Sequence, residues 1–489
     1  MRLRTLFMLL GAALTAFSPI SAVSEAQAAS VLIENVTVVS PEREAPLRDA
    51  FVLIEEGTIR SVGIVRPPAA RQKNIQVVDG RGRFLVPGLI DSHVHVGMPP
   101  GIGVVTPDFE KRHAEMLAAF WRQLPRSYLY HGVTTLVDLA SANVAAGHFR
   151  SGPVAPDLVT CAPLALERGY PAVLLPAEAH GQILPYTLPD DPGEAVRLVR
   201  SLQKDGHRCI KLFFEDGFGE ASHLPLPSER VVAAVRAEAR RLGLPVVIHA
   251  NALDMQTLAL RYQPDVLAHG LWGWGASTGA PDLPEPIRKH LDAVVASGTA
   301  YQPTFGVVDG LVHLFDPGFL DDPALKKVVP RSLLAWYRTD EAQAFKKGLA
   351  SENPAFADPA VARRIFEGVG NQAERALSYL ARNGGKILLG SDTPSAPTWT
   401  DQPGLNTWRE LQHMSRAGLA PRDLLKAATI RNAEVFGLRD LGTIEPGKTA
   451  NLLLLRADPL ASVEAWNEIE SVVLHGEVLP RESLAVPGN

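Results

Sequence analysis

Short apolar segments alternate with amphipathic ones through the middle of the chain. Eight of the short segments are rich in Val, Ile, Leu and Thr, and several are apolar at nearly every position, which is typical of strands buried on both faces of a parallel sheet. They span Phe84–Val96, Thr134–Ala140, Asp157–Leu164, Arg208–Phe214, Pro245–His249, Asp265–His269, Thr299–Phe305 and Lys386–Ser391. Amphipathic helix patterns such as Ser228–Leu242 lie between them. This alternation predicts an α/β fold, a (β/α)8 TIM barrel.

The two ends of the chain have a different pattern. Residues 30–87 and 433–489 contain short alternating runs joined by glycine turns, which indicates antiparallel strands. We therefore predict a small β-sandwich domain built from both chain ends, with the barrel of residues 88–432 inserted between them. Gly306–Pro359 has no clear strand pattern and is too long for an ordinary connection, so a lid or an insertion is expected there.

The first residues have the pattern of a secretory signal. Arg2 and Arg4 precede an apolar run, and small residues at Ala26–Ala29 supply a cleavage site. Because the run is shorter than the roughly 20 residues of a membrane span, we predict a signal peptide over 1–29, with a retained N-terminal anchor as the alternative. Cleavage would leave an exported protein without stable membrane association, located in the periplasm if the source is a Gram-negative bacterium.

Composition excludes several classes of protein. Hydrophobic residues make up 46% and charged residues 21% of the chain, which excludes a disordered chain. The net charge of -5 gives no basic excess for nucleic acid, so we expect a small-molecule substrate and no nucleic-acid partner; a homo-oligomer is compatible with the sequence. The two cysteines exclude a disulfide scaffold or a multi-cysteine zinc site. Cys161 and Cys209 either pair or are small buried apolar residues.

Candidate metal-binding residues begin at the end of the first predicted barrel strand. His93 and His95 are two positions apart, so their side chains point to the same side of a strand. Two neutral imidazoles side by side suit a zinc-like ion. Taken alone, the pair is a weak signal, because two polar residues at a strand end are common.

Four further residues strengthen this signal. His249, His269 and Asp392 each end another predicted strand, and Lys211 lies within the fourth one. A lysine among apolar neighbours is costly to bury as a cation, so Lys211 must be paired, neutral or modified, unless it reaches the surface. Each histidine alone is more often a hydrogen-bonded core residue. Together, however, these side chains lie at the carboxyl ends of the strands, where barrel active sites form.

The order of these residues resembles the amidohydrolase superfamily. The resemblance begins at Pro87–His95 and covers nearly everything after the signal. It includes Gly390–Asp392, Ala427–Thr429 and the tail Gly442–Leu452. Within the superfamily, the chain is most similar to the branch of imidazolonepropionase and the metal-dependent Xaa-Pro and Xaa-Arg dipeptidases.

This resemblance implies a centre of two divalent metal ions, expected to be Zn2+. The implied ligands are His93, His95 and Asp392 for one ion, His249 and His269 for the other, and N-carboxylated Lys211 as a bridge between them. A hydroxide shared by the ions would attack the scissile carbonyl, since metal binding lowers the pKa of water toward neutrality. Asp392 would take the proton of the attacking water and give it to the leaving group.

Departures from the superfamily pattern narrow the expected reaction. Deaminases usually carry a glutamate three positions after the fifth-strand histidine, whereas Ala252 follows His249 at that distance, so nucleobase deamination is not expected. Imidazolonepropionase-like enzymes tend to lack the bridging lysine, so Lys211 points to a dinuclear centre. The dipeptidases place a tyrosine near this histidine; Asn251 is the nearest polar residue here, so peptide specificity does not carry over.

The expected activity is hydrolysis of an amide bond, in a peptide or an N-acyl amino acid. A lactone, ester or cyclic-amide hydrolase with the same site and a mononuclear imidazolonepropionase-like enzyme are the alternatives. A non-catalytic barrel would require lost ligands. His180 and Tyr186, in the loop after the third strand, are the candidate substrate contacts. Five aromatic residues near strand ends either form an apolar substrate wall or pack the barrel top: Trp272, Trp274, Tyr301, Phe305 and Trp399.

Overall fold

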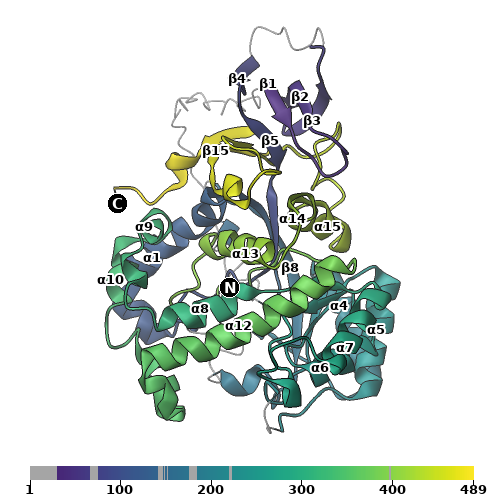
Figure 1. Ribbon diagram of the computed structural model, residues 1–489, viewed down its shortest axis with the longest axis vertical. Coiled ribbons are helices and arrows are strands. Elements are labelled where there is room, and N and C mark those ends of the chain that lie inside the picture. The colour runs from purple at the N-terminus through teal and green to yellow at the C-terminus, as the bar shows by residue number, and fades with distance from the viewer. Residues whose placement is uncertain are drawn as a thin grey trace, which may run out of the picture.

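The structure, a computed structural model, describes residues 30–66, 75–140, 147, 149–150, 152, 154–175, 184–219, 223–395 and 398–488. The predicted signal peptide, residues 1–29, lies outside these ranges. The described chain forms a ring of parallel strands surrounded by helices, and a separate mixed sheet at one end of the molecule (Figure 1). Across these ranges, no helix is both long enough and apolar enough to cross a bilayer.

Parallel strands form the ring, as the alternation of the sequence predicted. In spatial order they are β6 (Leu89–Val94), β7 (Val133–Asp138), β8 (Asp157–Ala165), β10 (Cys209–Phe213), β11 (Val246–His249), β12 (Val266–Ala268) and β13 (Ala300–Gln302), with the short β9 (Tyr186–Thr187) beside β8. The eighth predicted segment and the residues just after it close the ring through two parallel bridges, Tyr301 to Ile387 on one side and Val94 to Thr393 on the other. The predicted α/β barrel is therefore confirmed.

Helices cover the outside of the ring. They are α1 (Pro107–Tyr130), α4 (Pro192–Lys204), α5 (Glu229–Leu242), α6 (Leu253–Leu260), α7 (Glu285–Ser297), α12 (Pro359–Arg382), α13 (Leu405–Arg416), α14 (Pro421–Ala428) and α15 (Ile430–Val435). α5 matches its predicted range and ends at Gly243, whose φ of 68° favours glycine. Strand β10 shows how the layers form: Ile210 and Leu212 face the helix side, while Lys211 between them faces into the ring.

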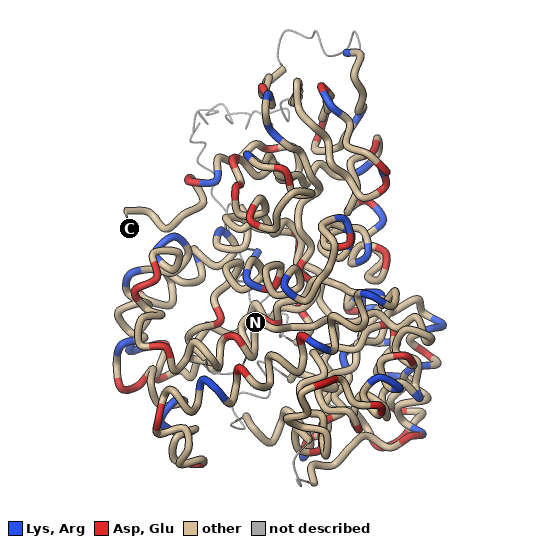
Figure 2. Tube along the Cα trace, viewed as in Figure 1, with Lys and Arg blue, Asp and Glu red and all other residues tan. Residues whose placement is uncertain are grey.

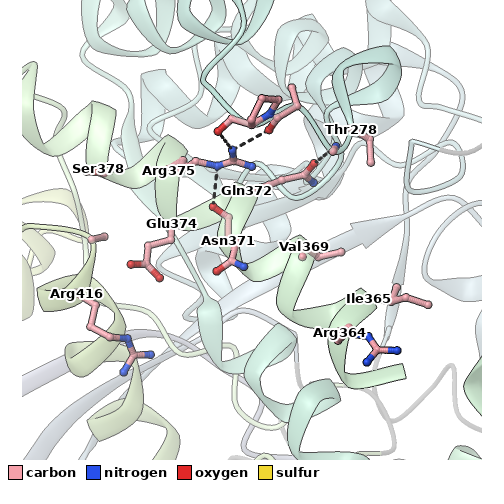
Figure 3. A pocket seen from close by; sticks show the side chains of 15 residues that line it. Thr278, Arg364, Ile365, Val369, Asn371, Gln372, Glu374, Arg375, Ser378 and Arg416 are labelled. Atoms are coloured by element: carbon pink, nitrogen blue, oxygen red, sulfur yellow. Dashed lines mark hydrogen bonds between the residues drawn. The ribbon is translucent and has the colours of Figure 1, made fainter. Parts of the chain in front are cut away.

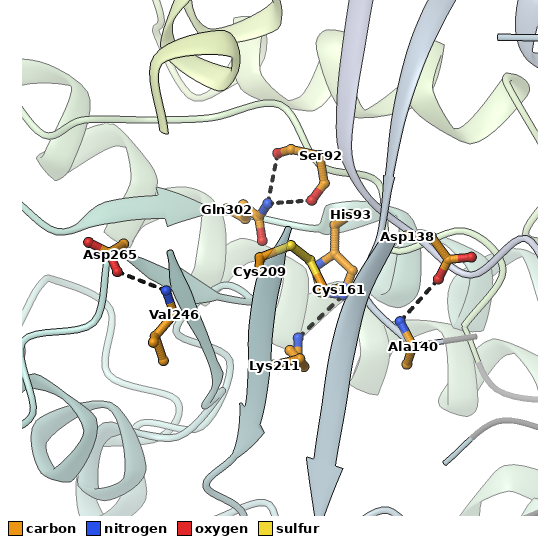
Figure 4. The surroundings of a disulfide bond; sticks show 10 residues. All are labelled: Ser92, His93, Asp138, Ala140, Cys161, Cys209, Lys211, Val246, Asp265 and Gln302. Atoms are coloured by element: carbon orange, nitrogen blue, oxygen red, sulfur yellow. Dashed lines mark hydrogen bonds between the residues drawn. A yellow bond between two sulfur atoms is a disulfide. The ribbon is translucent and has the colours of Figure 1, made fainter. Parts of the chain in front are cut away.

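Mostly small and branched apolar side chains from the barrel strands form one buried cluster, among them Val137, Val247 and Ala300. Cys161 on β8 and Cys209 on β10 are directly opposite each other, with Cα atoms 4.4 Å apart, and are joined in a disulfide. Figure 4 shows this bond close to His93 and Lys211. Of the two alternatives left open by the sequence, the structure therefore has the cysteines paired.

The second sheet joins the two ends of the chain. Its strands are β1 (Ser30–Val38), β2 (Leu47–Glu55), β3 (Thr58–Gly63), β4 (Ile75–Asp79), β5 (Phe84–Pro87), β14 (Leu452–Leu455), β15 (Ile469–Leu474) and β16 (Glu477–Pro480). β5 and β14 pair antiparallel, with Leu85 opposite Leu454, so the early and late segments meet at the centre of the sheet. A small β domain from both chain ends is thus present, as one continuous mixed sheet. The exact domain bounds remain predictions.

The long stretch after the seventh barrel strand is helical. It contains α8 (Phe305–Leu314), α9 (Pro323–Val328), α10 (Arg331–Trp336) and α11 (Ala344–Glu352). α8 packs against α12 and α13, and α9 and α10 pack against α1. Of the two expectations for this stretch, the structure therefore favours a packed insertion over a separate lid.

Charged residues of both signs are mixed over the whole molecule. Figure 2 shows Lys and Arg beside Asp and Glu on the barrel and on the sheet domain. Exposed pairs such as Arg112 with Glu341, 2.9 Å apart, are typical of this surface. Because exposed ion pairs contribute little to folding stability, the fold depends mainly on its buried layers.

Candidate metal centre

Asp392 lies at the middle of the predicted ligand set. Its Oδ1 is 2.8 Å from Nε2 of His95 and 3.2 Å from Nε2 of His93, and its Oδ2 is 3.4 Å from Nδ1 of His269. One ligand atom from each of His93, His269 and Asp392 can be chosen so that all lie within 4.8 Å of one another. Residues separated by about 300 positions in the sequence therefore converge at one point.

Lys211 and His249 complete the set. The Lys211 Nζ atom is 3.5 Å from Nε2 of His93, as the dashed line in Figure 4 shows. The ring centroid of His249 is 4.3 Å from that of His269. All six predicted ligands thus adjoin one another at the carboxyl ends of the barrel strands.

The backbone at the strand ends is itself unusual. His269 has φ of 84° and Asp392 has φ of 55°, a region that residues other than glycine rarely adopt. Such conformations persist where surrounding structure holds them, and they cluster at functional sites. Here the amide of Asp392 donates to the carbonyl oxygen of His93 at 2.7 Å, which fixes two predicted ligands relative to each other.

A buried carboxylate holds the strands that carry these ligands. Asp91 is fully buried and accepts hydrogen bonds at 2.6 Å from the hydroxyls of Ser391 and Thr407. It also accepts from the amide of His93 at 3.2 Å. Asp91 therefore joins the first barrel strand to the segment that ends in Asp392, and holds the ligands of the first and the last barrel segment in fixed relative positions.

Burial sets the protonation of the predicted ligands. It lowers the pKa of His93 and His269 well below the usual value, although the carboxylate of Asp392 opposes this effect, so both imidazoles are neutral. Burial raises the pKa of Asp392, but the facing histidines outweigh this and hold it well below its usual range. Neutral imidazoles and an ionised carboxylate are the forms that bind metal ions.

The donor set fits a pair of divalent cations. Imidazole nitrogens and carboxylate oxygens are common zinc ligands, and neutral imidazoles leave the buried charge of Asp392 to be balanced by a cation. Burial lowers the pKa of Lys211 to about 7, although Asp392 opposes this effect. The amine is therefore substantially neutral near pH 7, which is the form that adds carbon dioxide.

Two residues beside His249 were missed by the sequence analysis. Glu215 is 1% exposed and places Oε2 at 3.4 Å from Nε2 of His249. It directly follows the apolar run that ends at Phe214, and an ionisable residue at the end of such a run is the signal that could have found it. The ring of Tyr170 lies 4.5 Å from that of His249, and it comes from the loop after β8, where no local signal marked it.

The predicted substrate contacts are less well placed. His180 lies outside the described residues. The hydroxyl of Tyr186 is hydrogen bonded to Nε2 of His207 at 2.9 Å, on the chain just before β10. The role of both residues in substrate binding remains a prediction.

Most of the aromatic residues near the strand ends pack in the core. Trp272 lies beside the candidate metal centre, with its ring 5.3 Å from that of His269. The other four are buried: Trp274 beneath Arg375, Tyr301 with its hydroxyl on the amide of Leu271, Phe305 stacked on His413, and Trp399 beside Tyr337. Packing is therefore the correct alternative for these four, and Trp272 alone of the five contacts a predicted ligand.

A separate pocket of about 740 Å³ opens on the outside of the barrel. It lies between α12 and the segment from Thr278 to Pro281 (Figure 3). Arg375 crosses it and donates to the carbonyl oxygens of Ala280 and Pro281, so its guanidinium is already engaged. None of the predicted metal ligands lines this pocket, and it is not part of the centre.

Comparisons with known proteins agree with this geometry. Residues 346–479 match the model of the Amidohydrolase family, a range that includes Asp392. The fold matches a solved amidohydrolase with a TM-score of 0.65 and 22% identity, over 92% of this chain and 99% of the other. The resemblance to the amidohydrolase superfamily is confirmed.

Other amidohydrolase-like structures include members of the predicted branch. A Xaa-Pro dipeptidase matches with a TM-score of 0.63 and 19% identity, over 92% of this chain and all of the other. The ochratoxinase of A. niger matches with a TM-score of 0.62 and 21% identity, over 92% and 96% of the two chains. At these identities the likeness shows the fold alone.

Curated relatives match only short segments. A 5-methylthioadenosine/S-adenosylhomocysteine deaminase of Clostridium tetani is 34% identical over 70 residues, 14% of this chain and 16% of the relative. A D-hydantoinase of Streptomyces coelicolor is 34% identical over 100 residues, 20% of this chain and 18% of the relative. The chain thus matches less than a fifth of either relative.

Proposed function

We propose that this protein is a metal-dependent hydrolase that cleaves an amide bond, in a peptide or an N-acyl amino acid. The observation that carries the proposal is the convergence on Asp392 of His93, His95 and His269, with Lys211 and His249 alongside. His93, His95 and Asp392 would hold one ion, His249 and His269 a second, and N-carboxylated Lys211 would bridge them. Zn2+ is the expected metal because imidazole donors dominate the set.

The residues of the chain have separable roles in this reaction. Two cations bound here would acidify a water molecule and polarise the scissile carbonyl. Asp392 is the proton carrier: its ionised carboxylate accepts the proton of the water and delivers it to the leaving amine. Lys211 takes part after its amine forms a bond to the carbon of carbon dioxide and loses a proton, which converts a buried amine into a carboxylate.

The walls around the centre favour a substrate with an apolar group beside the scissile bond. Trp272 lies against His269 on one side, and Tyr170 lies against His249 on the other. Phe218, 5.3 Å from Tyr170 between ring centroids, is 45% exposed and extends this surface outward. Apolar walls with a few polar groups are typical of small-molecule sites.

A cyclic amide is the second candidate substrate. The partial similarity to a D-hydantoinase and to the dihydroorotase of Carboxydothermus hydrogenoformans supports it. The same ligand set could cleave either type of amide, because the scissile carbonyl rather than the ring determines the chemistry.

The signal pattern of residues 1–29 supports location in the periplasm, which N-terminal sequencing of the secreted protein would test.

A hydrolysis screen tests the proposed activity. Residues 30–489 would be prepared with Zn2+ and bicarbonate and offered N-acyl amino acids, dipeptides, hydantoins and lactones. We expect release of an amine from at least one acyclic amide, and loss of turnover in Asp392→Asn at unchanged thermal stability. Hydrolysis of hydantoins alone would support the second candidate. Cleavage confined to lactones, or a metal-loaded protein inert toward every substrate, would end the proposal.

A further inference from the structure

Glu215 is a buried carboxylate next to the metal centre that belongs to none of the predicted ligand pairs. It lies just after β10, the strand that carries Lys211 and ends at Phe213. Its Oε1 accepts a hydrogen bond from the amide of Gly217 at 2.8 Å and another from the amide of Phe218. These bonds to the turn after the strand fix the carboxylate in one orientation.

The second oxygen of Glu215 is directed at His249. Oε2 lies 3.4 Å from Nε2 of this imidazole, and both side chains are at most 4% exposed. The ring of His249 packs between Tyr170, at 4.5 Å, and His269, at 4.3 Å between centroids. Because neighbours on both sides restrict its rotation, the nitrogen that faces Glu215 stays there.

We propose that Glu215 is a positioning residue of the metal centre: it accepts the N–H of His249 Nε2 and thereby leaves Nδ1 with the free electron pair that binds a cation. Metal-binding histidines commonly donate their other ring N–H to a carboxylate, which selects the tautomer and strengthens the ligand. Both oxygens of Glu215 are engaged by donors of the chain, so it acts through His249.

This inference rests on the metal centre of the proposed function, but not on which bond is cleaved. It adds a residue to the centre and assigns the ligand nitrogen of His249. Metal binding can be measured without any substrate. A wild-type protein that binds two ions and hydrolyses no amide would therefore end the proposed function while leaving the role of Glu215 open to measurement.

Glu215→Gln is the decisive variant. The amide oxygen of glutamine can still accept from Gly217 and Phe218, but its NH2 group then faces Nε2 of His249. That nitrogen must become an acceptor, which moves the proton to Nδ1 and blocks the metal-binding position. We expect the affinity for the more weakly held ion to fall about 10- to 100-fold, measured by competition with a chromophoric chelator, with a changed absorption spectrum of the cobalt-substituted protein.

Two further variants control the experiment. Glu238→Gln makes the same change in another largely buried carboxylate, which lies on α5 and pairs with Arg200 on α4 and Arg241 on α5, and it should leave metal affinity and spectrum unchanged. Glu215→Asp retains the charge but shortens the reach to His249, and its affinity should lie between those of the wild type and Glu215→Gln.

The outcomes separate the proposal from a merely structural role. Weaker binding and an altered cobalt spectrum in Glu215→Gln at near wild-type thermal stability support it. Wild-type affinity and spectrum in this variant overturn it. If Glu215→Gln shows no cooperative unfolding transition, Glu215→Asp decides: a loss of affinity relative to Glu238→Gln supports the proposal, and equal affinity overturns it.

Discussion

At the scale of single residues, burial explains the chemistry of the centre. A lysine with 1% exposure has no water to solvate an ammonium ion, and burial lowers its pKa to about 7. Nearby imidazoles stay neutral for the same reason, while Asp392 remains ionised. The site thus places the ionised carboxylate of Asp392 beside the neutral imidazoles of His93 and His269, which is an arrangement that a cation stabilises.

Removing Lys211 tests this account directly. In Lys211→Ala the proposed bridging carbamate cannot form, so we expect turnover to disappear and the metal content to fall from the proposed two ions per chain to about one or fewer. Elemental analysis after dialysis measures the metal content. Lys204→Ala, an exposed lysine at the end of α4, should retain both metal and activity. Full metal content in Lys211→Ala would exclude a bridging role.

At the scale of elements, the strand ends were predictable from local sequence. An apolar run that stops at a histidine or aspartate marks the point where a buried strand reaches the barrel mouth, and a lysine inside such a run is a signal of its own; all six predicted ligands adjoin one another. Tyr170 was not predictable, because its place beside His249 depends on the path of a loop. Trp274 and Tyr301 were ambiguous because a strand-end aromatic can face either the pocket or the core.

Pairing between distant segments was harder to predict than the segments themselves. The sequence indicated strands at both chain ends but not how they join, and β5 and β14 pair to form one continuous sheet. Whether the cysteines pair could not be predicted for a similar reason: Cys161 and Cys209 face each other only because β8 and β10 are neighbours in the ring.

The disulfide should make a large contribution to stability. It connects residues 48 positions apart, and the chain-entropy model assigns about 4 kcal/mol to a loop of that length. We therefore expect the double variant Cys161→Ala/Cys209→Ala to unfold at a lower urea concentration than the wild type, with a free energy of unfolding reduced by up to about 4 kcal/mol. When the wild type is unfolded and refolded in a reducing agent, its unfolding transition should shift to a similarly lower urea concentration. The same treatment should not shift the transition of the double variant. Identical unfolding curves would contradict this expectation.

At the scale of the whole molecule, a small polar network ties the sheet domain to the barrel. Asp157, at the start of β8, is 2.9 Å from Nε2 of His475 and accepts from Asn451 at 2.8 Å. The hydrogen bond and charge of Asp157 raise the pKa of His475. The protonated histidine therefore stabilises the folded state below its ordinary pKa, and this contribution is lost as the pH rises through the raised value.

The pH dependence of unfolding tests this connection. His475→Asn retains a residue that tolerates the positive φ of 47° at this position but removes the titrating charge. We expect the variant to melt below the wild type at pH 6 and close to it at pH 9, with a small difference because the side chain is 54% exposed. When Asp157→Asn is introduced into both proteins, the difference in melting temperature between them at pH 6 should become smaller. Melting curves that run parallel at all pH values would show that the ion pair does not contribute.

The position of the disulfide also constrains the order of events in assembly. Both cysteines are 0% exposed inside a closed ring of strands. Once the ring has closed, an oxidant such as glutathione or a thiol oxidase has no path to the sulfur atoms, so the bond must form while β8 and β10 are still accessible. Oxidation therefore accompanies folding rather than following it, and protein that folds in a reducing compartment would retain two thiols that later exposure to air does not join.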